Sequence, residues 1–220
     1  MNQILDIYLD RDVETKHHDI QQCLSSEERD PDFCGAQKSI YLQIPFYGEN
    51  KLLDVGPAGG YSTFKLRDRG FDVRGISIIK EDIDHLAKYS IPGDVGDMHN
   101  LPYENGLFSH ILASHVLEHS PAPYIAIKEF YRVLGNSGFL VLVLPQWNGK
   151  TNDRLISDFT HHIFCVPPDG IFFFLKKVGF SLIKFEMVPQ FVTIGGKRTI
   201  QYYHEFYLAF KGNLAELDSL

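Results

Sequence analysis

Apolar and polar positions change their spacing repeatedly along this chain. Four short segments predict strands, and the last of them, 139–145, is an apolar run typical of a strand buried on both faces of a sheet. The four segments lie at 51–55, 72–78, 107–114 and 139–145. Three stretches between them carry apolar residues at helical spacing, which predicts helices over about 60–69, 80–89 and 121–134. This alternation predicts a doubly wound, mostly parallel α/β sheet with helices on both faces.

The chain changes character after Pro145. Residues 146–168 are polar, aromatic and irregular, as is typical of a binding loop. A further helix is predicted at about 168–178. Two strands at about 180–193 and 198–210, joined by a Gly-Gly turn, predict a C-terminal antiparallel hairpin. We expect strand 198–210 to be an edge that another chain could pair with.

Three shorter segments complete the pattern. Residues 135–138, Gly-Asn-Ser-Gly, predict a turn, and the turn-rich segment 91–103 leaves room for only a very short strand. The apolar segment 40–47 has two interpretations, which both stay open. It either packs across the edge of the domain or forms a flap over a ligand.

These elements predict a single domain. In chain order, it comprises an N-terminal lid or edge segment, a cofactor-binding core, an acceptor loop, and a last helix with its hairpin. The four parts lie at 1–50, 51–145, 146–168 and 169–211. A chain of 220 residues is long enough to bury a sizeable core in one such domain.

Composition excludes several classes of protein. A net charge of −7 argues against a general affinity for nucleic acid. The three widely spaced cysteines favour reduced thiols in a cytoplasmic setting over a disulfide framework. The first residues lack the features of a secretory signal, and no apolar run approaches the ~20 residues of a membrane span. We therefore expect a cytoplasmic protein without a membrane partner.

The stretch 51–61, KLLDVGPAGGY, predicts a nucleotide-type site. An apolar strand leads into a glycine-rich turn, and the turn opens a helix whose first N–H groups are available to a ligand. A dinucleotide fingerprint would place glycine at Tyr61 and an acidic residue at Ser77. Both departures count against a nicotinamide enzyme, which would bind NAD.

Four motifs in order resemble those of class I S-adenosylmethionine-dependent methyltransferases, in particular the small-molecule group that includes ubiquinone-pathway enzymes. Asp54-x-Gly56-x-Ala58-x-Gly60 is similar to that family's D-x-G-x-G-x-G. The other three are 96-GDMHNLPYENGLF-108, 114-SHVLEH-119 and 128-KEFYRVLGNSGFLVLVLP-145. The resemblance covers residues 51–145 and implies a Rossmann-like methyltransferase fold.

The resemblance implies roles for residues around the cofactor. Its methionine end would be held by Asp54, the loop residues Gly56, Pro57, Ala58 and Gly60, and Ser114 beside the sulfonium. Its adenine would be held by Asp97, which accepts from the amino group, and by Met98. Ser77 stands where the family usually has an acidic residue that binds the ribose hydroxyls. We do not transfer that role to Glu81 or Asp82, which belong to the following helix.

The same resemblance implies methyl transfer to a small-molecule acceptor, and we expect oxygen in preference to nitrogen. A hydroxyl acceptor needs a base, and histidine is the usual one. His115 and His162 are the catalytic candidates. Candidate substrate contacts in the irregular loop are Trp147, Arg154 and His161.

Two other functions are weighed against this one. Ala58 and Ser77 keep open a catalytically silent nucleoside-binding module on a methyltransferase fold. The segment 115–119 matches H-x-x-E-H, a zinc-peptidase signature, but prolines at 121 and 123 cut short the helix that such a site requires. We therefore predict no metal ion. One alternative stays open, a divalent metal near His115, Glu118 and His119, because the segment resembles the E-x-x-E-H of some ubiquinone-pathway O-methyltransferases that are thought to use such an ion.

Overall fold

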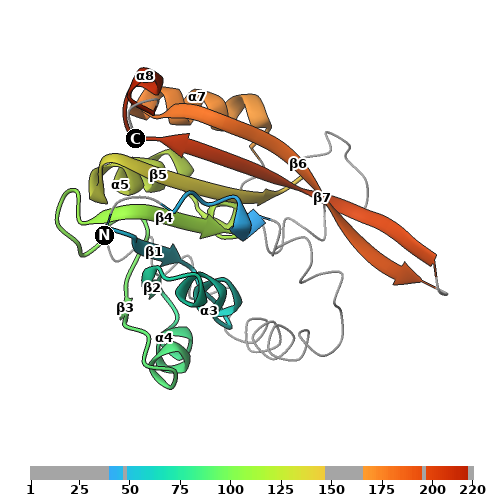
Figure 1. The fold of residues 1–220 in the computed structure, drawn as a ribbon, viewed down its shortest axis with the longest axis horizontal. Helices are drawn as coiled ribbons and strands as arrows, with labels where there is room; N and C mark the ends of the chain where they lie inside the picture. Colours follow the sequence, from blue (N-terminus) through green and yellow to red (C-terminus); the bar gives the residue numbers. More distant parts are fainter. Residues whose placement is uncertain (1–39, 47–48, 147–165, 195–196, 218–220) are drawn as a thin grey trace.

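The computed structural model describes residues 40–46, 49–146, 166–194 and 197–217. Its centre is a seven-stranded sheet in the order β3-β2-β1-β4-β5-β7-β6 (Figure 1). The strands are β1 Lys51–Val55, β2 Asp72–Ser77, β3 Gly93–Val95, β4 Phe108–Ser114, β5 Leu134–Pro145, β6 Ser181–Ile194 and β7 Lys197–Phe210. The first five are parallel, and β7 runs antiparallel to both β5 and β6. The predicted fold is confirmed.

Of the described α-helices, all but the last, short one lie where the sequence predicts them. They are α3 Tyr61–Asp68, α4 Lys80–Ala87, α5 Pro123–Val133, α7 Pro168–Val178 and the short α8 Leu214–Leu217. Pro123 begins α5, because proline at the first helical position loses no hydrogen bond. Gly179, with φ of 116°, ends α7 in the left-handed conformation that glycine adopts without strain. Of the described helices, none is long and apolar enough to cross a bilayer.

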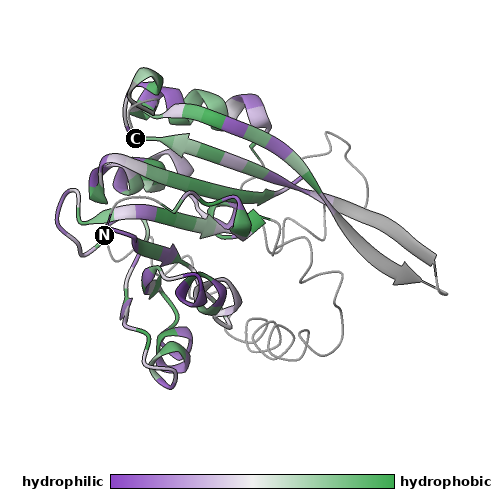
Figure 2. Cartoon of the chain, viewed as in Figure 1, coloured by the Kyte–Doolittle hydropathy of each residue, from purple (hydrophilic) through white to green (hydrophobic). Residues whose placement is uncertain are grey.

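Two hydrophobic cores lie on the two faces of the sheet. Alternate side chains of the strands enter opposite cores, so Leu53 and Val55 belong to one and Leu52 to the other. The core of Leu53 and Val55 is covered by α5 and α7, and the core of Leu52 includes Leu66 of α3. In Figure 2 the central strands are mostly green, in keeping with burial on both faces.

The segment 40–46 packs against the second core. Ile40, Tyr41 and Ile44 are buried there, and the Arg69 guanidinium donates to the backbone oxygens of Tyr41 and Ile44. The described part of the segment is thus held against the sheet, and both interpretations of it stay predictions. The remainder of the predicted lid lies outside the described residues.

Two expectations were wrong. Strand β5 begins at Leu134, which pairs with Phe108, so residues 135–138 lie within the strand's bounds and not in a separate turn. They form an irregularity in the ladder, because the next pair joins His110 to Phe139. The strand at 197–210 is not an edge either. It lies between β5 and β6, so β3 and β6 are the edges of the described sheet.

Candidate functional site

A cavity lies at the carboxyl ends of β1, β2 and β4. The sheet order changes direction between β1 and β4, and open α/β sheets bind ligands outside the strand ends at such a point. Four segments contribute lining residues, namely the loop after β1, the end of β2 with the start of α4, the loop after β3, and the turn after β4. The topology therefore brings together motifs that are far apart in the sequence.

The glycine loop forms one wall of this cavity. Gly56 has φ of 68°, and a Cβ atom there would lie 2.8 Å from Cγ2 of Val116, in the turn after the adjacent strand β4. Ala58 also lines the cavity, with φ of 45°, a conformation that costs a residue with a Cβ atom about 1 kcal/mol. Gly60, with φ of 80°, is the residue from which α3 starts. The loop is thus shaped by a backbone that suits glycine.

Asp54 faces away from the cavity, toward α3. Its Oδ2 accepts hydrogen bonds of 2.8 Å from both Ser62 and Thr63, the second and third residues of that helix. The side chain is almost fully buried and its hydrogen-bond donors are neutral. Burial outweighs these two hydrogen bonds and raises the pKa of Asp54 from 3.8 to about 6. Asp54 therefore supports the helix start and holds an ionisable group that is costly to charge.

The buried hydroxyl of Tyr41 lies beside this carboxylate. It hydrogen-bonds with the side chains of Ser62 and Ser114, and burial together with the charge of Asp54 raises the Tyr41 pKa. Ser114, which ends β4, is therefore engaged by the segment 40–46. Neither Ser114 nor Asp54 lines the described cavity.

The loop after β3 presents Asp97 and Met98 to the cavity. The backbone N–H of His99 donates to Asp97 Oδ1 over 2.9 Å, and Nδ1 of the same residue lies 2.6 Å from that oxygen. Burial alone would raise the pKa of Asp97, but the two contacts from His99 hold it below its ordinary value. The imidazole also contacts Ser120 Oγ at 2.6 Å. Asp97 is thus fixed and ionised.

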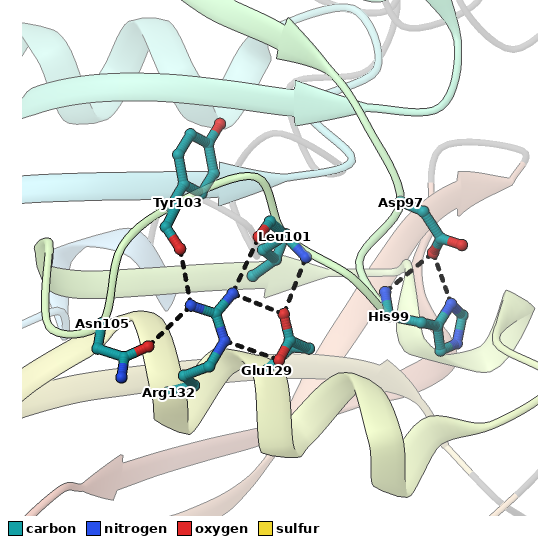
Figure 3. Close-up of polar contacts among 7 residues, drawn as sticks. All are labelled: Asp97, His99, Leu101, Tyr103, Asn105, Glu129 and Arg132. Atoms are coloured by element: carbon teal, nitrogen blue, oxygen red, sulfur yellow. Dashed lines mark hydrogen bonds and ion pairs between the residues drawn. The ribbon is translucent and has the colours of Figure 1, made fainter. Parts of the chain in front are cut away.

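An arginine on α5 fixes the rest of this loop. The Arg132 guanidinium donates to the backbone oxygens of Leu101 and Tyr103, to Asn105 Oδ1 and to both carboxylate oxygens of Glu129. Glu129 in turn accepts from the Leu101 N–H over 2.9 Å (Figure 3). A planar guanidinium with several donors suits this role, because one side chain binds several acceptors in fixed directions.

The end of β2 and the start of α4 form a third wall. Ser77 Oγ donates to Asp82 Oδ2 over 2.7 Å and accepts from the Ile79 N–H over 3.1 Å. Both Ser77 and Asp82 are buried, yet both line the cavity. Asp82 was not predicted as a site residue. The absence of an acidic residue at position 77 was the signal that could have directed attention to it.

His115 follows β4 and lines the cavity. Its φ of 54° is uncommon for a residue with a Cβ atom, and such backbone strain clusters at functional sites. Nδ1 lies 3.3 Å from Glu118 Oε1, and Nε2 lies 2.8 Å from Nδ1 of His204 on β7. Burial, followed by the neighbouring His115, lowers the pKa of His204 to about 3. His204 has no sequence signal, because it stands 89 residues away.

The predicted site residues fall into three groups. Those that line the cavity are Gly56, Ala58, Ser77, Asp97, Met98 and His115. Those that lie beside it without lining it are Asp54, Pro57, Gly60 and Ser114. Trp147, Arg154, His161 and His162 lie outside the described residues.

The H-x-x-E-H segment does not have the geometry of a zinc-peptidase helix. Leu117–His119 form a three-residue 3₁₀ helix, and His115 precedes it with a left-handed backbone. The described ranges contain no group of three His, Cys, Asp or Glu side chains placed to share a metal ion.

Comparisons with known proteins give a family match, curated relatives and solved structures with a similar fold. Residues 53–142 match the family described as "Methyltransferase domain". A 2-methyl-6-phytyl-1,4-hydroquinone methyltransferase of Synechocystis is 30% identical over 111 residues, which are 48% of this chain and 34% of that protein. The chain spans about a third of the length of the curated relatives it matches.

Solved structures share the fold at low identity. A chain of the Haloferax volcanii complex with a methyltransferase activator has a TM-score of 0.72 and 12% identity, covering 88% of this chain and 94% of that one. The Burkholderia thailandensis 1,6-didemethyltoxoflavin-N1-methyltransferase has a TM-score of 0.63 and 15% identity. Its structure contains 1,6-didemethyltoxoflavin and S-adenosylhomocysteine. The coverage is 88% of this chain and 87% of that one.

Proposed function

We propose that this chain, which carries a class I S-adenosylmethionine-dependent methyltransferase domain, transfers a methyl group from S-adenosylmethionine to a small molecule. The observation that carries the proposal is the meeting of the glycine loop, the Asp97 loop and the turn after β4 around one cavity at the β1–β4 switch point. The family match spans the residues that build these three walls.

The lining residues fit an adenosine with a polar extension. Asp97 uses Oδ1 for both contacts from His99, and Figure 3 shows its second oxygen directed away from that residue. We assign this oxygen to the adenine amino group, which donates hydrogen bonds. Met98 supplies apolar contact beside the ring. A Cβ atom at Gly56 would collide with Val116, so the loop can pack against the turn after β4 in this conformation only with glycine there.

The methionine end is assigned to the start of α3. The first N–H groups of a helix have no partner within it and suit a carboxylate. Asp54 supplies the negative charge that favours an ammonium group nearby, and its hydrogen bonds to Ser62 and Thr63 fix that helix start. A direct contact between Asp54 and the ammonium stays a prediction.

The sulfonium of S-adenosylmethionine supplies an activated methyl group, so the protein mainly aligns the acceptor and manages one proton. We assign proton acceptance to His115, because it lines the cavity and Glu118 can stabilise its imidazolium form. The contact between Nε2 and His204 must yield when an acceptor approaches that nitrogen. This role favours a hydroxyl acceptor over an amine, and His162 remains a second candidate.

The name of the Synechocystis relative suggests the first acceptors to test. A hydroquinone and a simple phenol should each be incubated with the protein and S-adenosylmethionine that carries a labelled methyl group. Transfer of the label to either compound would establish the reaction.

Calorimetry with S-adenosylmethionine and S-adenosylhomocysteine tests the proposal before an acceptor is known. We expect saturable binding of both compounds. Absence of binding up to about millimolar concentration would refute the enzyme. Binding without transfer to any acceptor of a broad panel would instead favour the silent nucleoside-binding module.

A further inference from the structure

We propose that Asp82, in the first turn of α4, is the residue that binds the ribose hydroxyls of the cofactor, and that Ser77 positions it. This inference rests on the proposed function, since it assigns a residue to the sugar of the same ligand. It also revises our sequence analysis, which placed Ser77 at the ribose and left Asp82 out.

The hydroxyl of Ser77 is already engaged in two hydrogen bonds. A serine hydroxyl carries one proton, and Ser77 donates that proton to Asp82 Oδ2 over 2.7 Å. The same oxygen accepts from the Ile79 N–H over 3.1 Å. These two bonds fix the hydroxyl between β2 and α4. Ser77 is therefore a positioning residue and has little capacity left for two ribose hydroxyls.

The Asp82 carboxylate lies at the wall of the cavity. Asp82 is only 3% exposed, yet it lines the cavity together with Ser77 and Ile79. Asp97 and Met98, which we assign to the adenine, line the same cavity. A carboxylate at this place lies where a sugar attached to that adenine would be expected.

The hydrogen-bonding capacity of the Asp82 carboxylate also suits a ribose. An ionised carboxylate accepts hydrogen bonds at about four lone-pair sites. Asp82 can therefore accept the hydrogen bond from Ser77 and also hydrogen bonds from a vicinal diol. A carboxylate in the first turn of a helix is also favoured by the helix dipole. The arrangement suits a ribonucleoside with both hydroxyls free.

Glu81 offers a matched control. It precedes Asp82 in the same helical turn but is exposed and does not line the cavity. Glu81→Gln and Asp82→Asn therefore make the same chemical change on the two sides of one helix. Asparagine at position 82 keeps an oxygen that can accept from Ser77 and replaces the second oxygen by an NH₂ group.

The experiment is calorimetry with S-adenosylhomocysteine and its 2′,3′-dideoxy analogue, with thermal unfolding to confirm that each variant is folded. We expect the unmodified protein and Glu81→Gln to prefer the natural ligand by at least about tenfold. Asp82→Asn should bind it at least about tenfold more weakly and lose the preference for the diol. Ser77→Ala should weaken binding by about threefold and keep part of the preference.

Two results would overturn the inference. The first is that Asp82→Asn binds S-adenosylhomocysteine with the same affinity as Glu81→Gln and still prefers it over the dideoxy analogue. The other is loss of the preference in Ser77→Ala while Asp82→Asn keeps it, which would make Ser77 the acceptor. Both outcomes leave the proposed function intact, whereas failure of the unmodified protein to bind S-adenosylhomocysteine would remove the proposed function and this inference together.

Discussion

Asp54, near the carboxyl end of β1, and Asp97, in the loop after β3, are two carboxylates whose charges the protein holds in opposite ways. Asp97 receives two hydrogen bonds from His99, and its pKa lies below the ordinary value. Asp54 receives hydrogen bonds only from hydroxyl groups among its described contacts, and its pKa is raised to about 6. One carboxylate is charged before a ligand arrives, and the other is costly to charge until a cation comes near.

The difference separates rigidity from adaptability. The Asp97 loop is fixed by Arg132 and Glu129 on α5, so its geometry exists without ligand. Around Asp54, a cationic ligand would relieve an unfavourable charge, so binding there at about pH 6 and below should be linked to proton release. Under the proposed assignment, the Asp97 loop provides shape for the adenine, and Asp54 provides a response to the charge of the methionine end.

The largest expected effect comes from breaking the adenine side at its support. Arg132→Gln removes the hydrogen bonds to Leu101, Tyr103, Asn105 and Glu129, and it leaves several partly buried acceptors without this donor. We expect the free energy of unfolding to fall by roughly 3 kcal/mol in urea titrations. Lys128→Gln, an exposed change on the same helix, is the control. Equal effects of the two variants would contradict the proposed support.

The next effect concerns ligand affinity on the same side. Asp97→Ala removes a charged acceptor that we assign to the adenine amino group, so S-adenosylhomocysteine should bind about 30- to 100-fold more weakly by calorimetry. Glu104→Gln changes an exposed acidic residue of the same loop and should leave the affinity unchanged. If Asp97→Ala binds as tightly as Glu104→Gln, the adenine assignment is wrong.

The methionine side should respond to pH in a way that Asp54 controls. Its pKa is higher in the folded state, about 6 against 3.8, so the folded protein binds more protons between these values. Stability that depends on Asp54 is therefore lost as the pH rises from about 4 to 6. Asp54→Asn should raise the free energy of unfolding at pH 8 by about 2 kcal/mol, less than the roughly 3 kcal/mol of the full shift.

The difference between Asp54→Asn and the unmodified protein isolates this residue from other titrating groups. Buried His110 and His204 have pKa values lowered to about 4 and 3, so their contribution to stability increases as the pH rises. This trend is opposite to that of Asp54. Urea titrations at pH 4, 6 and 8 should give a difference that grows with pH. A constant difference would show that Asp54 has an ordinary pKa.

The smallest expected effect concerns the glycine loop itself. Ala58 holds a φ of 45°, and its side chain is exposed, so glycine there would relieve strain without removing buried contacts. We expect Ala58→Gly to raise the free energy of unfolding by about 0.5–1 kcal/mol. Ala87→Gly, at an exposed position near the end of α4, should have the opposite sign because glycine weakens a helix. Destabilisation by Ala58→Gly would contradict the strain argument.

Much of the fold follows from local patterns in the sequence. Strands β1, β4 and β5 are apolar runs, and α5 repeats its apolar residues at helical spacing, so these elements can be recognised without long-range information. The direction of Asp54 was also accessible, because strand alternation places it on the face of Leu52 and not on that of Leu53 and Val55.

The parts that could not be predicted depend on distant partners. Arg132 contacts a carbonyl 31 residues earlier, and His204 contacts His115 from 89 residues away. Neither spacing leaves a periodic signal. Whether Asp82 points into the cavity depends on the rotation of α4 about its axis, which an eight-residue helix with mixed composition does not reveal. Family motifs supplied most of the predicted site because they record such contacts indirectly.

The position of β7 between β5 and β6 has a consequence for synthesis on the ribosome. Strand β5 ends at Pro145, but the strand that covers its free edge begins at Lys197, about 50 residues later. At roughly 5–20 residues per second, the nascent chain exposes the unpaired, strongly apolar β5 for several seconds. A hydrophobic edge of this kind is prone to aggregate. Premature termination or a translational pause within this interval should therefore increase the demand for chaperones.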